Sequence, residues 1–255
     1  MFKARFALLC SLLWLSLACH AAADNYLRLA ATEWPPYTSS NLPGSGLAAE
    51  IVAAAFRQVG YRVEYVVRPW LRAQRMVQNG ELDGMGIAWY TDDRAATMAY
   101  SRPFLRTEIV LIKHRDDDTV YDHPDHLNNK HFSVLRGYGY LNLVQSESIR
   151  TTVLDNLEQS FEMLASKRID LTLEEKLNAQ YRLSFLAPSI RRLIAFAPQP
   201  LEVKDLHITI SRKHPHYEQI IADFNRGLGQ IIADGSYQAL LQSYQPRLTP
   251  LGVLE

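Results

Sequence analysis

Apolar and polar residues alternate along the chain in blocks that predict strands separated by helices. Short runs rich in β-branched and aromatic residues predict strands at 26–31, 61–67, 82–89, 107–114, 131–136, 149–154, 169–173 and 206–211. Apolar residues at helical spacing predict helices at 47–60, 71–78, 157–167, 217–233 and 236–244, with another helix after Gly139. This alternation is typical of an α/β fold with parallel sheets.

Two features divide this pattern into two α/β units. The segment 114–131, HRDDDTVYDHPDHLNNKH, is the most polar in the chain, and Pro198 and Pro200 precede the strand at 206–211. The chain therefore crosses between the units twice, near 110 and near 205. Two sheets joined by two extended crossings predict a two-lobed molecule with a cleft.

The first 23 residues have the pattern of a secretory signal peptide. A basic start precedes an apolar run over 6–18 and three alanines at 21–23, so we expect cleavage after Ala23. The apolar run is too short to span a bilayer. Cys19 leaves a lipid-modified N-terminus as the alternative to soluble export, and the other cysteine, Cys10, also lies within 1–23.

Composition narrows the function classes. The 232 residues after the signal hold 25 basic and 27 acidic residues, a net charge near −2. No basic excess indicates binding to nucleic acid or to a membrane surface.

Arg94 is the strongest candidate for ligand binding. It follows the expected strand at 82–89, and ligands of open α/β sheets bind at the carboxyl ends of strands. Asp92 and Asp93 before it are typical of a helix start. A guanidinium offers a planar fork of donors that matches a carboxylate. The alternative is a surface arginine paired with Asp92 or Asp93.

The order and spacing of several motifs carry a resemblance to a known family. They are EWPPYT, GLAAEIVAAAF, RPWLRAQRMVQNGELDG, YTDDR with SRPF, RGYGY, KRIDLTLEE and ADFNRGLGQIIADGSYQALLQSY. Together they resemble the polar-amino-acid family of bacterial extracellular solute-binding proteins, the ligand-capturing subunits of ABC importers. The resemblance implies a type II periplasmic binding protein-like fold, with two α/β lobes joined by a two-strand hinge. Lobe one would comprise 24–113 and 205–255, and lobe two 114–204.

The resemblance also implies roles for residues of lobe one. Arg94 matches the arginine that binds the ligand carboxylate, and Trp34 and Trp70 match aromatic residues that flank the ligand. The backbone of Ala88 and the residue at Tyr90 match positions that bond the ligand from the strand end. Core packing is the alternative for Trp34, Trp70 and the nearby Tyr37, but their places at strand ends favour the cleft.

In lobe two, Gly137 and Tyr138 occupy a turn where many relatives have a small Gly-Thr-Thr-like sequence. Glu175, or its neighbour Glu174, matches an aspartate that holds the ligand ammonium, and Glu33 is a second candidate partner for that group. A glutamate pair at a helix start also fits simple compensation of the helix dipole, and both interpretations stay open.

We expect neither a metal nor a cofactor nor a catalytic group. The segment 114–131 holds four histidines and a run of three aspartates at 116–118, but their spacing fits no compact zinc motif and indicates a polar loop. No serine-histidine-aspartate arrangement, phosphate-binding loop or HExxH is recognisable.

The expected function is therefore capture of a small polar carboxylate, most simply an amino acid, by a monomeric periplasmic protein. Its partner would be the membrane permease of an ABC importer. Two alternatives remain: a periplasmic cyclohexadienyl dehydratase-like enzyme on the same fold, and a ligand-sensing accessory protein.

Overall fold

The computed structural model describes residues 25–138 and 146–248. Within these residues the strands form one sheet in the order β2-β1-β3-β9-β5-β8-β6-β7, with β4 paired to β9. The strands are β1 (Tyr26–Ala31), β2 (Arg62–Val67), β3 (Gly84–Trp89), β4 (Met98–Tyr100), β5 (Leu105–His114), β6 (His131–Leu135), β7 (Arg150–Leu154), β8 (Leu171–Glu175) and β9 (Ile194–Ser211).

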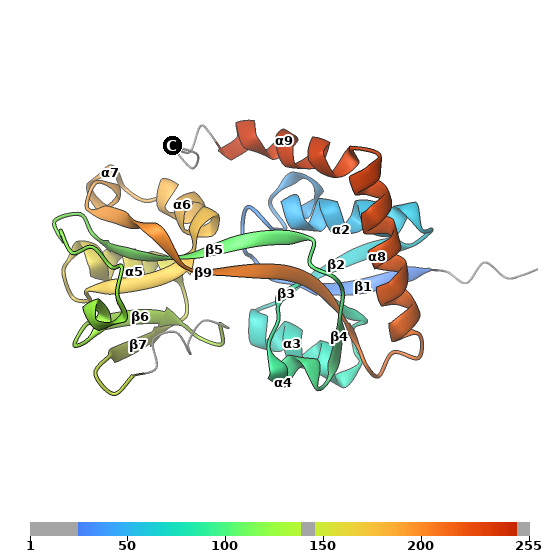
Figure 1. The fold of residues 1–255 in the computed structure, drawn as a ribbon, viewed down its shortest axis with the longest axis horizontal. Coiled ribbons are helices and arrows are strands. Elements are labelled where there is room, and N and C mark those ends of the chain that lie inside the picture. Colours follow the sequence, from blue (N-terminus) through green and yellow to red (C-terminus); the bar gives the residue numbers. More distant parts are fainter. Residues whose placement is uncertain (1–24, 139–145, 249–255) are drawn as a thin grey trace, which may run out of the picture.

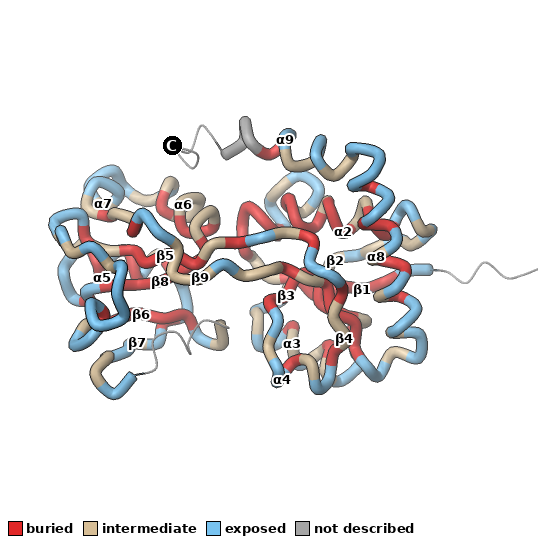
Figure 2. The backbone as a smooth tube through the Cα atoms, viewed as in Figure 1, coloured by how far each residue is buried: buried red, intermediate tan, exposed pale blue. Residues whose placement is uncertain are grey.

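Two long antiparallel strands, β5 and β9, connect the two halves of the molecule (Figure 1). β5 pairs with β9 from Leu105 to His114 and also with β8 over 109–113. β9 pairs with β3 and β4 over 206–211. The middle of β9 is largely exposed or half-buried, whereas buried residues concentrate on the strands of each half (Figure 2). This arrangement provides the two-strand connection that the sequence predicts.

One half of the molecule contains residues 25 and 248, the first and last described residues, and is built on parallel strands β2, β1 and β3. Its helices are α2 (Leu47–Gln58), α3 (Trp70–Asn79), α4 (Asp92–Ala95), α8 (Tyr217–Ala233) and α9 (Ser236–Leu248), with a short 3₁₀ turn at Pro43–Ser45. Helix α8 buries Ile220, Phe224, Leu228 and Ile231, which recur at helical spacing on one face. That face packs against α2.

The other half is built on parallel strands β8, β6 and β7. Its helices are α5 (Leu157–Ala165), α6 (Lys176–Ser184) and α7 (Pro188–Arg191), and a 3₁₀ turn lies at Pro124–Leu127. Phe161 and Leu164 of α5 are fully buried against this part of the sheet. The carboxyl ends of the parallel strands in the two halves approach the junction between them, which is where a ligand site is expected.

The α/β fold and its two lobes are confirmed, while the lobe boundaries stay a prediction. The prediction of two separate sheets was wrong, because β5 and β9 pair with strands of both halves and join them into one sheet. The observed β1 and α8 have the predicted bounds. The predicted bounds of β8 were wrong: the strand continues to Glu175, so the glutamate pair ends a strand, and Glu175 also caps the helix α6 that follows. The predicted helix after Gly139 and the signal segment lie outside the described residues.

The sequence prediction also missed the first twelve residues of β9, which contain Pro198 and Pro200. Over that part β9 pairs only with β5, so a proline can leave its missing N–H on the unpaired side. The pairing register also shifts around Val110, which lies opposite Pro200.

Candidate functional site

Arg94 is a buried cation at the carboxyl end of β3. Thr91 caps α4 by accepting a hydrogen bond from the Arg94 backbone N–H. The Arg94 side chain is directed back toward the strand end, where Nη1 donates to the carbonyl oxygen of Trp89 over 2.6 Å. Its guanidinium carbon lies 4.9 Å from the centre of the Trp70 ring.

Arg94 is only 5% exposed, and no acidic side chain in the described part of the chain forms an ion pair with it. The predicted alternative, a pair with Asp92 or Asp93, is therefore not what this structure contains. A buried guanidinium without a counter-ion is costly, and an anionic ligand would compensate it.

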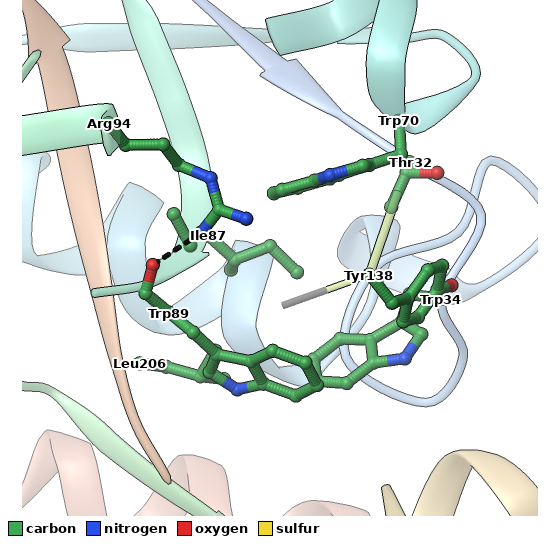
Figure 3. A pocket seen from close by; sticks show the side chains of 9 residues that line it. Thr32, Trp34, Trp70, Ile87, Trp89, Arg94, Tyr138 and Leu206 are labelled. Carbon is green, nitrogen blue, oxygen red and sulfur yellow. Dashed lines mark hydrogen bonds between the residues drawn. The ribbon is translucent and has the colours of Figure 1, made fainter. Parts of the chain in front are cut away.

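Three tryptophans and Arg94 enclose a small pocket of about 40 Å³. Figure 3 shows the Arg94 guanidinium and the Trp70 ring on one side of this space, and the Trp34 and Trp89 rings on the other. Trp34 and Trp89 meet edge to face, with ring centres 5.5 Å apart. The remaining lining residues are Thr32, Ile87, Ala88, Tyr138 and Leu206, so the walls are mostly apolar.

The indole N–H groups of these tryptophans differ in their partners. Trp34 Nε1 donates to Glu174 over 3.3 Å, and Trp89 Nε1 donates to Thr107 over 3.0 Å. Trp70 Nε1 is buried and has no hydrogen-bond partner among the described residues. The pocket wall thus holds an unpaired donor in addition to the Arg94 guanidinium.

A second, larger cavity of about 370 Å³ adjoins the Arg94 pocket. Thr32, Trp70 and Tyr138 line both spaces. The charged residues of the larger cavity are Glu33, Arg136, Asp155, Glu158 and Arg182. Two salt bridges pair four of them, Arg136 with Asp155 and Arg182 with Glu158, each at 2.9 Å.

Hydrogen bonds hold the loop after β1 against the end of β8 and the start of α6. We call these contacts, between residues 33–37 and residues 174–182, the junction. Its four hydrogen bonds are Trp34 Nε1 to Glu174 (3.3 Å), Tyr37 OH to Glu175 (2.9 Å), Asn178 Nδ2 to the Pro35 carbonyl (2.6 Å) and Arg182 Nη2 to the Glu33 carbonyl (2.9 Å). The junction brings together segments that belong to the two predicted lobes.

Glu174 and Glu175 are both buried in this junction, 0% and 1% exposed. Glu175 accepts hydrogen bonds from Tyr37 and from the Asn178 backbone N–H, and so caps α6. Burial raises the pKa of Glu175 to about 8. The hydrogen bonds from Asn178 and Tyr37 lower this pKa and only partly offset the effect of burial, while the charge of the neighbouring Glu174 raises it further. Burial and the nearby Glu175 also raise the pKa of Tyr37.

The other residues proposed from sequence have varied positions. Ala88 and Tyr138 line the Arg94 pocket, and Glu33 lines the larger cavity, where Ser40 donates to its carboxylate. Tyr37 is in the junction and lines neither the Arg94 pocket nor the larger cavity. Tyr90 is 53% exposed and donates to Asp92.

Gly137 lies close to the other half of the molecule. Its φ is +76°, and a Cβ there would come within 2.6 Å of Leu71 on α3. A side chain at this position would therefore interfere with the approach of the two halves.

Several residues of the site were not singled out from sequence. Trp89 was predicted only as the last residue of a strand, although a tryptophan at a strand end was the signal that identified Trp34. Asn178 and Arg182 gave no such signal, because their partners lie more than 140 residues away in the chain.

The histidines over 114–131 bond to their neighbours and do not converge. Among the described residues no group of three or more potential ligands could hold a metal ion. The pairs are His114 with Asp116, His123 with Asp125, His126 with Asp122 and His131 with Thr152.

Comparison with solved structures places the fold among solute-binding proteins. The substrate binding protein of an amino acid ABC transporter matches with a TM-score of 0.70 and 16% identity over 87% of this chain and 99% of its own. An ancestral amino acid-binding protein, AncCDT-1, described as a precursor of cyclohexadienyl dehydratase, matches with a TM-score of 0.69 and 18% identity over 86% and 95%. At these identities the likeness shows the fold alone.

Among characterised sequences, the virulence sensor protein BvgS of Bordetella pertussis is 25% identical over 130 residues. That match spans 50% of this chain and only 10% of the sensor protein. In the described part of the chain, no helix combines the length and the apolar character needed to cross a membrane.

The family model of bacterial extracellular solute-binding proteins, family 3, matches residues 27–247. This range includes the strand end with Arg94, the loop with Trp34 and the junction, and the chain belongs to this family.

Proposed function

We propose that this protein captures a small carboxylate-bearing solute in the periplasm and delivers it to the permease of an ABC importer. The observation that supports this most is Arg94, a buried cation with no acidic partner among the described residues, in the wall of an otherwise apolar pocket. A solute carboxylate would supply the missing counter-ion. Amino acids are the first solutes to test, because proteins of similar fold bind them.

In this proposal Trp34 and Trp70 provide the apolar contact for the solute, and the two halves close over it. The small pocket binds the carboxylate end, and the larger cavity accommodates what extends beyond Trp70 and Tyr138. The lobes correspond to 24–113 with 205–255, and to 114–204.

The test begins with a thermal-shift panel of amino acids and small carboxylates, because a ligand selective for the folded protein raises its melting temperature. Calorimetry on the best ligand then compares the wild type with Arg94→Ala and Arg94→Lys. We expect Arg94→Ala to lose about 2–5 kcal/mol of binding free energy, and lysine to recover part of it, since lysine lacks the planar fork.

Arg106→Ala is the matched control, because Arg106 is an exposed arginine that pairs with Asp205. It should bind like the wild type. The melting temperature of the unliganded Arg94→Ala protein separates binding from a structural role. Removal of an uncompensated buried charge should leave that temperature unchanged or higher, while a structural role would lower it. Unchanged affinity in Arg94→Ala would disprove the proposal.

Two other functions have specific support. The neighbour that preceded a dehydratase, and the buried carboxyl of Glu175 with its raised pKa, favour an enzyme. Against this, Glu175 lines neither cavity and its carboxylate is bonded to Tyr37 and Asn178. Aromatic product formed from prephenate or arogenate, and lost in Glu175→Gln, would establish catalysis.

The match to BvgS favours a sensing role, in which the partner is a receptor instead of a permease. Uptake of the radiolabelled solute by cells with and without this protein distinguishes the two. Uptake that depends on the protein supports import, and unchanged uptake with an altered transcriptional response supports sensing.

A further inference from the structure

The Arg94 pocket offers hydrogen-bond donors but few acceptors. The Arg94 guanidinium carries five N–H groups and, among the residues that the structure describes, forms one hydrogen bond, to the Trp89 carbonyl. Trp70 Nε1 is a buried donor with no partner among the described residues. None of the nine lining residues is acidic.

Two residues that line the pocket, Trp89 and Thr32, have backbone carbonyl oxygens that already accept hydrogen bonds. The carbonyl oxygen of Trp89 accepts from Arg94 and also from the Tyr100 hydroxyl, at 2.6 and 3.2 Å, which occupies both of its lone pairs. The carbonyl oxygen of Thr32 accepts from the Thr38 hydroxyl over 2.7 Å.

The carboxylates that could receive an ammonium lie elsewhere. Glu174 and Glu175 accept hydrogen bonds from Trp34 and Tyr37 in the junction, and neither lines the Arg94 pocket or the larger cavity. The raised pKa of Glu175 also favours its neutral form, which is a poor partner for a cation. Glu33 lines only the larger cavity.

The position of these carboxylates outside the Arg94 pocket matters most for α-amino acids. Their ammonium nitrogen is attached to the carbon next to the carboxylate, so it must enter the same pocket as the carboxylate that Arg94 binds. There it would be removed from water beside the Arg94 guanidinium and mostly apolar walls, with no carboxylate among the nine lining residues, which disfavours binding of the charged ammonium.

We infer that the solute is a carboxylate with an apolar α-position, and that this site selects against an α-ammonium group. This inference rests on the proposed role of Arg94. The pocket volume of about 40 Å³ is equivalent to about three water-sized spheres, which suits a carboxylate and the one or two carbons next to it. Longer ligands continue past Trp70 and Tyr138 into the larger cavity.

The test uses pairs of ligands that differ only by the ammonium group. Propionate is compared with alanine, and 3-phenylpropionate with phenylalanine, by calorimetry on the full chain. We expect the ligand without the ammonium group to bind at least tenfold more tightly in the pair that binds best, and its affinity to be lost in Arg94→Ala.

Tighter binding of the amino acid in both pairs, with its affinity lost in Arg94→Ala, would overturn this inference and leave the proposed function standing. Preference for the ammonium-free ligand that persists in Arg94→Ala would refute the role of Arg94 on which both depend. If neither member of either pair binds, the inference about ligand class is wrong.

Discussion

Replacing Glu175 with glutamine should make the stability of the protein much less dependent on pH. Glu175 is 1% exposed, and burial raises its pKa from the ordinary 4.5 to about 8. The folded state therefore binds one more proton than the unfolded state between these two pH values. The contribution of Glu175 to the unfolding free energy is therefore fully present below pH 4.5 and is lost as the pH rises through 8.

The magnitude follows from the two pKa values of Glu175. Each pKa unit corresponds to about 1.4 kcal/mol, so the full loss across the window is on the order of 5 kcal/mol. Between pH 5.5 and 7.5 the wild type should lose about 3 kcal/mol of unfolding free energy through this group. Glutamine has the same shape and no charge, so Glu175→Gln should lack this loss.

Urea unfolding at several pH values measures the difference, because contributions from groups that do not interact with Glu175 cancel between the two proteins. The neighbouring Glu174→Gln is the control: removing its charge lowers the pKa of Glu175, so the loss should shrink but persist. Equal pH dependence in the wild type and Glu175→Gln would refute the reasoning. It would mean that Glu175 is ionised in the folded protein despite its burial.

Two further predictions use glycines. A Cβ at Gly227 would lie 2.0 Å from the carbonyl oxygen of Ala55, whereas one at Gly229, in the same helix, would meet nothing within 4 Å. Gly227→Ala should lower the unfolding free energy by about 1–3 kcal/mol, and Gly229→Ala should raise it by about 0.5–1 kcal/mol. Urea unfolding measures both, and equal effects of the two substitutions would contradict this packing. Gly137→Ala should weaken solute binding, measured by calorimetry, because the new methyl group meets Leu71. Leu71→Ala in the same protein should restore part of the affinity. Full affinity in Gly137→Ala alone would argue against a close approach of the two halves at Gly137.

Local sequence patterns were sufficient for elements whose stability comes from one repeating face. Helix α8 was predictable because its buried residues recur at helical spacing, and β1 because a short apolar run ends at a polar turn. β9 was not, because its prolines argue against a strand unless the unpaired side of the strand is known. Only the pairing with β5 supplies that information.

Some residues of the candidate site could likewise be identified from local sequence, and others could not. Arg94 could be proposed because its position relative to a strand end is local information. The junction could not, since it depends on hydrogen bonds between residues about 140 positions apart, such as Trp34 and Glu174. Sequence also suggested Glu175 as a partner for the solute, whereas the structure gives its carboxylate to Tyr37 and Asn178.

Trp34 belongs both to the junction and to the wall of the Arg94 pocket, so it connects solute binding to the contact between the two halves. One edge of its indole donates to Glu174 in one half of the molecule, and its ring forms a wall of the Arg94 pocket in the other. A solute that packs against this ring therefore contacts a residue held in place by both halves. Tyr138 of the other half also lines this pocket, so a solute that binds more tightly when the two halves are joined would stabilise the joined arrangement by that difference in binding free energy.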